Sequence, residues 1–242
     1  MIIEFPGTKG EIEESSAIHK YHSSLIVKYK RTNMLIDLGL KFNPKLLKEI
    51  NGFSYILITH AHPDHYIWTI KEENKINIPV YLTRDTLDYS KNKPENYSVI
   101  ETGRNYILED LEITAYKVIH SLRCPAVGYR IKGDKAFIYA PDIVDFQQDK
   151  RIVLNDIDLL IADGSSLNVN MVRRRDGRLF GHTRVKTIIG WCKKYDIGRL
   201  VITHCGKQIV TMDSGELKSR LESYADDNID VNVAFDGYKM KL

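Results

Sequence analysis

The sequence predicts a layered α/β protein in which helices cover mixed β-sheets, and two observations lead to this class. Short runs rich in β-branched residues, typical of strands, occur at residues 24–29, 34–37, 55–59, 80–82, 111–119, 127–131, 136–139, 159–162, 200–203 and 231–235. Four segments suit helices, at residues 44–50, 84–89, 183–195 and 215–227. Because the second half of the chain alternates strand with helix, we expect sheets with helices on their outer faces.

The best-defined helix spans residues 183–195, where Val185, Ile188, Ile189 and Cys192 recur at the spacing of one helix face. The longest irregular stretches are 9–23, 89–97 and 164–182. We find no linker-like segment and no repeat with a period of 20–50 residues. The chain is therefore expected to form one domain over residues 1–242.

The composition is that of an ordinary globular protein, with 43% hydrophobic and 28% charged residues. The net charge of +3 is too small to indicate nucleic-acid binding by itself. No run approaches the ~18 apolar residues of a membrane span, and the N-terminus lacks the pattern of a signal peptide. Cys124, Cys192 and Cys205 form no CxxC pair, which favours a reducing compartment. These features predict a cytoplasmic protein with no membrane partner.

The strongest chemical signal is the segment Tyr-Ile-Leu-Ile-Thr-His-Ala-His-Pro-Asp-His at residues 55–65. An apolar strand ends there in a loop that holds His60, His62, Asp64 and His65. Alternation along an extended chain places His60 and His62 on one side. Imidazole and carboxylate groups suit zinc, manganese or iron, so this loop predicts a metal site.

The same loop, His-Ala-His-Pro-Asp-His, resembles the HxHxDH signature of the metallo-β-lactamase superfamily. Residues 34–39, Met-Leu-Ile-Asp-Leu-Gly, are similar to that family's first motif, in which the aspartate, here Asp37, supports the metal loop. His120, Asp142 and His204 also follow strand-like runs. The resemblance implies a four-layer αββα sandwich of two mixed β-sheets flanked by helices, with the active site at one edge.

The resemblance also implies two divalent metal ions, most simply Zn²⁺, with Mn²⁺ or Fe as alternatives. His60, His62 and His120 would hold the first ion, and Asp64, His65 and His204 the second. Asp142 would bridge the two together with a water or hydroxide, although Asp145 competes for that position. Two ions of this kind generate hydroxide near neutral pH.

A second pair of residues narrows the reaction. Asp163 ends another apolar run, and His182 precedes the helix at 183–195. An acid beside a histidine can keep the ring protonated for a leaving group. Their order resembles the phosphodiesterase branch of the superfamily, which includes RNase Z and the cyclic phosphodiesterase of phosphonate breakdown. Asp64, Asp163 and His182 are therefore the expected catalytic residues.

Arginines are concentrated between Asp163 and His182. Arg173, Arg174, Arg175 and Arg178 lie in one short stretch, and Arg123 follows His120. Guanidinium groups match phosphate oxygens in bidentate geometry, so these five are the expected substrate-binding residues, with a solvated loop as the alternative for the cluster. The loop with His19, Tyr21 and His22 could also cover the active edge.

These patterns predict a metal-dependent phosphodiesterase acting on a small phosphodiester or on nucleic acid. One alternative is a carboxylic ester, thioester or lactone hydrolase on the same two-metal site. Another is a non-catalytic, metal-stabilised nucleic-acid-binding module. A complete set of ligands argues against this last alternative, because a structural zinc site is closed by four ligands. A homodimer is one option for the assembly, since apolar helix faces can pair between chains.

Overall fold

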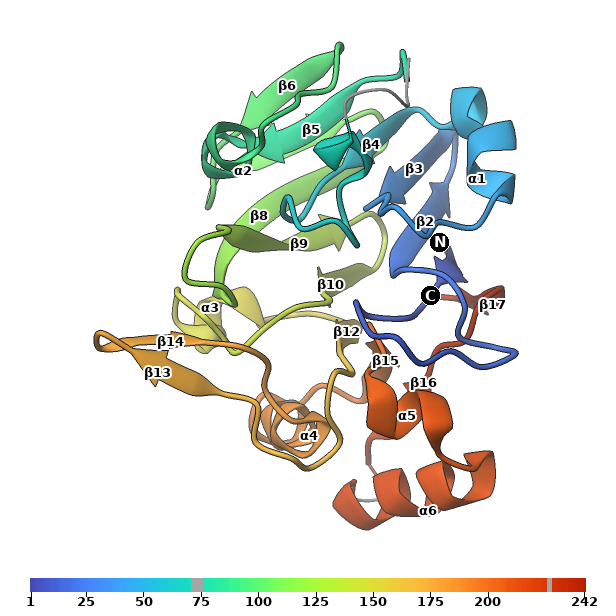
Figure 1. Cartoon of the computed structure of the whole chain (residues 1–242), viewed down its shortest axis with the longest axis vertical. Helices are drawn as coiled ribbons and strands as arrows, with labels where there is room; N and C mark the ends of the chain where they lie inside the picture. The colour runs from blue at the N-terminus through green and yellow to red at the C-terminus, as the bar shows by residue number, and fades with distance from the viewer. Residues whose placement is uncertain (71–75, 226–227) are drawn as a thin grey trace.

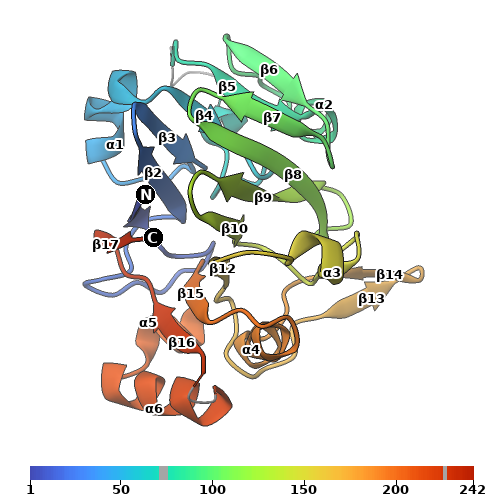
Figure 2. The same cartoon turned by 180° about the vertical axis from the view of Figure 1, so that it is seen from behind.

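The computed structural model describes residues 1–70, 76–225 and 228–242. Two sheets pack face to face (Figures 1 and 2). In the described chain the first sheet has the order β17-β1-β2-β3-β4-β5-β6. Its strands are β1 (Ile2–Gly7), β2 (Ser24–Tyr29), β3 (Thr32–Ile36), β4 (Tyr55–Leu57), β5 (Val80–Thr83), β6 (Tyr97–Ile100) and β17 (Tyr238–Lys241). Pairing is antiparallel from β17 to β3 and parallel from β3 to β6.

The second sheet is likewise antiparallel in one part and parallel in the other. Its order is β11-β8-β9-β10-β12-β15-β16, and β7 pairs with β8. Its strands are β7 (Asn105–Leu108), β8 (Leu111–Ile119), β9 (Ala126–Lys132), β10 (Ala136–Ala140), β11 (Asp145–Phe146), β12 (Leu159–Asp163), β15 (Arg199–Thr203) and β16 (Asp230–Val233). Strands β10, β12, β15 and β16 run parallel, and the other pairs are antiparallel. A hairpin of β13 (Arg173–Arg175) and β14 (Arg178–Phe180) projects from the body (Figure 1).

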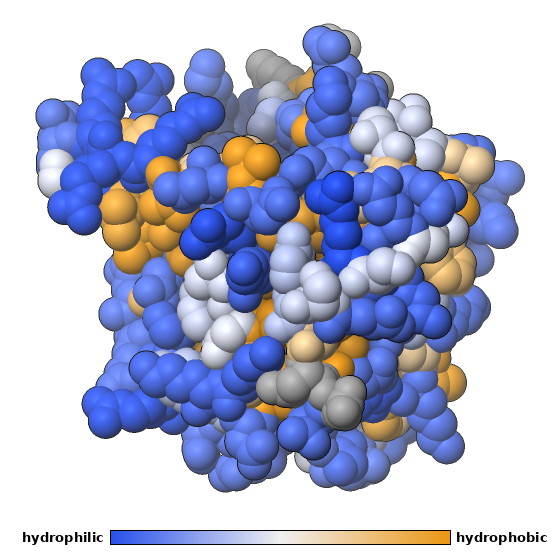
Figure 3. All heavy atoms as spheres, turned by 90° about the horizontal axis from the view of Figure 1, so that it is seen from below, coloured by the Kyte–Doolittle hydropathy of each residue, from blue (hydrophilic) through white to orange (hydrophobic). Residues whose placement is uncertain are grey.

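Helices cover the outer face of each sheet. Helices α1 (Lys45–Lys48) and α2 (Arg84–Tyr89) and the 3-10 turns η1 (Ile50–Gly52) and η2 (Ile67–Thr69) accompany the first sheet. Helices α3 (Lys150–Val153), α4 (Val185–Lys194), α5 (Lys207–Thr211) and α6 (Ser214–Tyr224) accompany the second. No helix in the described part of the chain is long and apolar enough to span a membrane. The face that carries α4–α6 is mostly hydrophilic, with separate apolar patches (Figure 3).

The hydrophobic core shows the layers directly, because alternate residues of one strand enter different clusters. In β12, Leu159 and Ile161 pack between the two sheets, whereas Leu160 and Ala162 pack under the helices of the second sheet. A third cluster, which includes Ile56 of β4, lies under the helices of the first sheet. Three apolar interfaces separate four layers, which confirms the predicted αββα sandwich of two mixed sheets.

Each of the ten predicted strands and four predicted helices overlaps an observed element. The last part of the helix predicted for 215–227 includes residues 226 and 227, which lie outside the described residues. Nine of the strands and α-helices in the described residues were not predicted from the sequence: strands β1, β6, β7, β11, β13, β14 and β17 and helices α3 and α5. Most of these are short edge or hairpin elements with exposed positions, where apolar periodicity is weak.

Candidate metal centre

The predicted ligands come together at one edge of the sandwich, just beyond the ends of β4, β8, β10 and β15. The structure brings their ligand atoms into overlapping groups that could hold a metal ion: His60, His62 and His120; His60, His65 and Asp142; and Asp64, His65 and His204. Six of these seven side chains are buried, and His62 is half-buried. Residues up to 144 positions apart in the chain therefore converge on one cluster.

Asp37 supports the loop after β4 from beneath, as the first motif predicted. Its carboxylate accepts hydrogen bonds from the Thr59 amide at 2.8 Å and from His65 Nδ1 at 2.8 Å. The Thr59 hydroxyl also donates to Asp37 and lies 3.0 Å from His60 Nδ1. Asp37 adopts a left-handed φ of 62°, a conformation that aspartate tolerates better than most residues. Gly39 completes the motif, since a Cβ there would lie 2.0 Å from the Asp64 carbonyl oxygen.

The first group consists of three imidazoles whose free nitrogens face one another. His62 Nδ1 lies 3.0 Å from His60 Nε2 and 3.2 Å from His120 Nε2. The opposite nitrogen of His60 is held by the Thr59 hydroxyl, and that of His120 lies 3.3 Å from the Gly181 carbonyl oxygen. Tetrahedral zinc with Zn–N bonds of 2.0–2.1 Å requires nitrogens about 3.3 Å apart. The three rings therefore fit a metal ion.

The second group contains carboxylates as well as imidazoles. His204 Nε2 lies 3.1 Å from Asp64 Oδ2, and His65 Nε2 lies 3.3 Å from the same oxygen and 2.8 Å from Asp142 Oδ2. His65 Nδ1 donates to Asp37, which leaves Nε2 as the nitrogen that faces Asp64 and Asp142. Burial opposes protonation of this ring, but the neighbouring carboxylates outweigh it and raise the pKa of His65 well above its ordinary value. The buried nitrogen and carboxylate oxygen thus share a proton in the metal-free chain, and a metal ion would replace that proton.

The charge balance leads to the same conclusion. Asp37, Asp64, Asp142 and Asp163 are all buried, and no lysine or arginine in the described ranges forms an ion pair with them. Burial opposes their charge, yet the neighbouring imidazoles hold the pKa of Asp64 and that of Asp142 well below the usual range. Imidazoles are thus the only positive partners of these buried carboxylates among the described residues, and incompletely compensated buried charge is costly. Divalent cations would supply the remaining positive charge.

The imidazoles of the first group are suited to ligation because they are uncharged. Burial lowers the pKa of His120 to about 4 and that of His60 well below its ordinary value. A metal ligand must be a neutral imidazole. Both rings therefore meet this condition at neutral pH.

Asp163 and His182 also meet as predicted. His182 Nδ1 donates to Asp163 Oδ2 at 2.8 Å and lies 3.5 Å from Asp142 Oδ1. The ring also belongs to two further groups that could hold a metal ion, one with His120 and Asp142 and one with Asp163 and His204. Burial opposes protonation of the ring, but the Asp163 carboxylate outweighs it and raises the pKa of His182 to about 9. Its Nε2 has no hydrogen-bond partner in the described part of the chain. The arrangement presents a protonated nitrogen at the rim of the cluster.

Ser165 was not among the site residues expected from the sequence. Its hydroxyl lies 3.0 Å from His182 Nδ1 and 3.1 Å from His204 Nδ1, and its amide donates to Asp163 at 2.8 Å. It therefore links the Asp163–His182 pair to the second ligand group. The available signal was its place two residues after the acid that ends β12.

The loop at 9–23 reaches the centre through a glycine. A Cβ at Gly10 would lie 2.9 Å from Cε1 of His204, and His204 has a left-handed φ of 52°. The Gly10 amide also donates to the Cys205 carbonyl at 3.1 Å. The backbone at Gly10 therefore packs closely against the His204 ring.

The three residues singled out in that loop each have a hydrogen-bond partner outside it. His19 Nδ1 lies 2.8 Å from the Thr8 hydroxyl, and the Tyr21 amide donates to Asp236. His22 Nδ1 accepts from the Lys41 amide at 3.3 Å. Substrate contact by these residues stays a prediction.

The predicted arginines divide into two sets. Arg123, Arg174 and Arg178 line a hollow beside the centre. Arg173 and Arg175 do not belong to its lining. Asp145, the competitor for the bridging position, forms an ion pair with Lys150 and belongs to none of the ligand groups.

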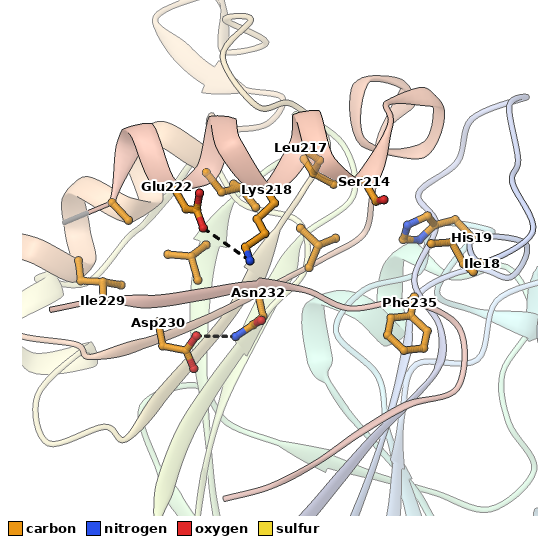
Figure 4. Close-up of a pocket in the computed structure, with 14 residues that line it drawn as sticks. Ile18, His19, Ser214, Leu217, Lys218, Glu222, Ile229, Asp230, Asn232 and Phe235 are labelled. Atoms are coloured by element: carbon orange, nitrogen blue, oxygen red, sulfur yellow. Dashed lines mark hydrogen bonds and ion pairs between the residues drawn. The ribbon is translucent and has the colours of Figure 1, made fainter. Parts of the chain in front are cut away.

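A separate hollow of about 580 Å³ lies between α6 and β16 (Figure 4). Leu217 and Phe235 are among its apolar side chains, and Lys218 pairs with Glu222 at its side. His19 is its only histidine, and none of its lining residues belongs to a ligand group found in the described ranges. We therefore place the chemistry at the edge of the sandwich and not in this hollow.

Fold and ligand clusters together define a metallo-β-lactamase-type protein, and comparison with known families agrees. Residues 32–205 match the family described as "Beta-lactamase superfamily domain", and the chain belongs to that family. The resemblance drawn from the metal loop is thereby confirmed.

Among curated relatives, a "UPF0173 metal-dependent hydrolase" of Dinoroseobacter shibae is 23% identical over 172 residues, covering 63% of this chain and 74% of the relative. A UPF0173 protein of Pyrococcus abyssi is 29% identical over 127 residues, covering 50% of this chain and 57% of the relative. The match thus spans less than two thirds of the second relative.

Solved structures share the fold along nearly the whole chain. Zn²⁺-bound PqqB from Methylobacterium extorquens has a TM-score of 0.77 at 18% identity, covering 100% of both chains. An isothiocyanate hydrolase from Delia radicum gut bacteria has a TM-score of 0.72 at 14% identity, covering 100% of this chain and 99% of that one. A diphosphatase of the PhnP family has a TM-score of 0.70 at 18% identity, covering 100% and 97%.

Proposed function

We propose that the protein is a metal-dependent hydrolase that cleaves phosphodiesters. The first half of this statement rests on the two ligand groups, on Asp142 within reach of residues from both, and on the similarity to a relative named as a metal-dependent hydrolase. The second half rests on the Asp163–His182 pair and on the cationic hollow beside it. The fold shared with a PhnP-family diphosphatase is consistent with phosphoryl chemistry.

In this proposal His60, His62 and His120 would hold one ion, Asp64, His65 and His204 would hold the other, and Asp142 would contact both. When bound, two such cations lower the pKa of a bridging water and neutralise charge that develops on the phosphoryl oxygens. Zn²⁺ is the simplest choice for this donor set, and Mn²⁺ or Fe would also be accommodated.

The chain itself would supply the proton for the leaving group. Nδ1 of His182 donates to Asp163. The proton that the ring could give to a leaving group is therefore the one on Nε2. A histidine whose pKa is raised to about 9 is protonated at neutral pH. Positioned general acids of this type typically contribute 10²–10⁴-fold to rate. Asp163 would act as the positioning residue and His182 as the acid.

The single observation that carries the phosphodiesterase proposal is therefore His182, held by Asp163 within 3.5 Å of Asp142. The test compares wild type with H182A on two diesters, thymidylyl-thymidine and bis(p-nitrophenyl) phosphate. We expect about 10²–10⁴-fold loss of kcat on the dinucleotide and a much smaller loss on the nitrophenyl diester, whose leaving group needs no proton. Elemental analysis should still find two metals per chain.

Other outcomes would change the assignment. Equal losses on both diesters would show that His182 does not act as an acid. Hydrolysis of carboxylic esters, thioesters or lactones without any diester cleavage would keep the metal centre and replace the substrate class. Salt-sensitive nucleic-acid binding without turnover would favour a metal-stabilised binding module.

A further inference from the structure

The hollow lined by Arg123, Arg174 and Arg178 is a groove of about 530 Å³ next to the metal centre. One wall is the hairpin β13–β14, and the other is the loop that follows His120. This basic groove is distinct from the apolar hollow of Figure 4, which lies at α6.

The groove is attached to the centre at two points. The Gly181 amide, between the hairpin and His182, donates to the His120 carbonyl at 2.7 Å. Arg178 Nη2 donates to the Leu122 carbonyl at 3.1 Å and ties the hairpin to the opposite wall. Arg123 follows His120 by three residues and Arg178 precedes His182 by four. Their Cα atoms are therefore at most about 11 Å and 14 Å from those of the two histidines.

The charges of the groove are largely uncompensated. Its lining holds four cationic side chains, those of Lys117, Arg123, Arg174 and Arg178, and one carboxylate, that of Asp85. Asp85 is already paired with Lys117 at 2.7 Å. The guanidinium groups of Arg123 and Arg174 are exposed and make no ion pair or hydrogen bond with any described residue. Two free guanidinium groups thus face one space beside the reacting centre.

The lining also excludes one mode of nucleic-acid recognition. None of its residues is aromatic, and single-stranded nucleic acids are usually held by bases stacked on aromatic rings. Guanidinium groups instead match phosphate oxygens in bidentate geometry. The groove is therefore suited to a phosphate and not to a base.

We infer that this groove binds a second phosphate of the substrate, next to the diester that is cleaved. The inference rests on the proposed function and narrows it to substrates with at least two phosphates, such as oligonucleotides. Arg123 and Arg174 are the specificity-determining residues, and Arg178 holds the hairpin in place. Arg173 and Arg175 lie on the same hairpin but outside the groove.

The test uses the metal-loaded protein and three dinucleotides: thymidylyl-thymidine, and the same molecule with an additional 5′-phosphate or an additional 3′-phosphate. For wild type we expect kcat/KM to rise about tenfold with one of the added phosphates, as a charge-assisted contact provides. R174A and R123A should each reduce this ratio severalfold, mainly through KM. The matched control R173A removes the same charge from the same hairpin outside the groove, and should keep the wild-type ratio.

The possible results of this test separate the phosphate-binding groove from the proposed phosphodiesterase function. A wild-type ratio near one for both phosphorylated dinucleotides, with the plain dinucleotide still cleaved, overturns the groove and leaves the phosphodiesterase intact. If R173A and R174A lower the ratio of kcat/KM values equally, the hairpin attracts phosphate only through its overall charge, and the groove proposal is wrong. Cleavage of none of the three dinucleotides overturns the proposed function and the groove with it.

Discussion

The first ligand group (His60, His62 and His120) and the second (Asp64, His65 and His204) form the two halves of the proposed metal centre, and they are supported differently. In the first half, His60 is backed by the Thr59 hydroxyl and His120 by the Gly181 carbonyl, so every group is neutral. In the second half, Asp64 adds a carboxylate, and His65 is backed by the buried carboxylate of Asp37. Both halves meet at Asp142.

This difference predicts unequal metal affinities. Negative ligands and a carboxylate behind an imidazole both strengthen binding of a cation. The second half is also the more enclosed, with His65 0% and His204 4% exposed, whereas His62 of the first half is half-buried. We therefore expect the ion of the second half to exchange more slowly than that of the first.

The largest effect should come from the residue that the two halves share. D142A removes the carboxylate that faces His65 in the second half and lies within reach of His60 and His120 in the first, so both ions should be lost together. Turnover should fall by more than the 10–100-fold that loss of a supporting residue typically causes. Elemental analysis and diester hydrolysis with metal added back would check this. Retention of one firmly bound metal per chain would show that the halves are independent.

A smaller and one-sided effect is expected from D37N. The amide keeps a hydrogen-bond acceptor for His65 Nδ1 but removes the negative charge behind the ring. We expect metal affinity of the second half to fall by about 10–100-fold, so that the difference between the halves narrows. Dialysis against a graded series of chelator concentrations, followed by metal analysis, measures this.

The control for D37N is D145N, because Asp145 is a nearby carboxylate paired with Lys150 outside the ligand groups. It should keep the metal content of the wild type. If D37N binds both ions as wild type does, the charge of Asp37 does not explain the difference between the halves.

The parts of the centre that could be predicted are those whose ligating side chains lie in one short segment. The loop with His60, His62, Asp64 and His65 is recognisable by itself, because three imidazoles and a carboxylate follow one apolar strand. His120 and His204 each stand alone after a strand, and only the resemblance to a family linked them to that loop. The fold was predictable for a similar reason, since buried strands carry strong apolar patterns.

The parts that could not be predicted depend on contacts between distant segments. Ser165 lies against His182 and His204, which are 17 and 39 residues away, and a serine after a strand looks like any turn residue. That Arg174 lines the groove while Arg173 does not depends on how the β13–β14 hairpin lies against the loop after His120. The role of Gly10 likewise depends on a ring 194 positions further along the chain.

Gly10 gives the smallest predicted effect, and it acts only on the second half. In G10A the new methyl group would lie 2.9 Å from Cε1 and 3.1 Å from Nδ1 of His204. The ring cannot retreat freely, because Nδ1 faces Ser165 and Nε2 faces Asp64. Overpacking of this kind costs about 1–3 kcal/mol in the free energy of unfolding, and we expect a severalfold loss of metal affinity in the second half alone.

The matched control is G190A, in helix α4, where an added Cβ meets nothing within 4 Å. That exchange should raise the free energy of unfolding by about 0.5–1 kcal/mol and leave metal binding unchanged. Denaturant unfolding of the metal-free proteins and metal titration of the folded ones separate the two effects. If G10A loses stability but binds the second ion normally, the glycine serves only packing of the loop. If it loses the second ion while the first stays bound, the backbone at residue 10 positions His204 for ligation.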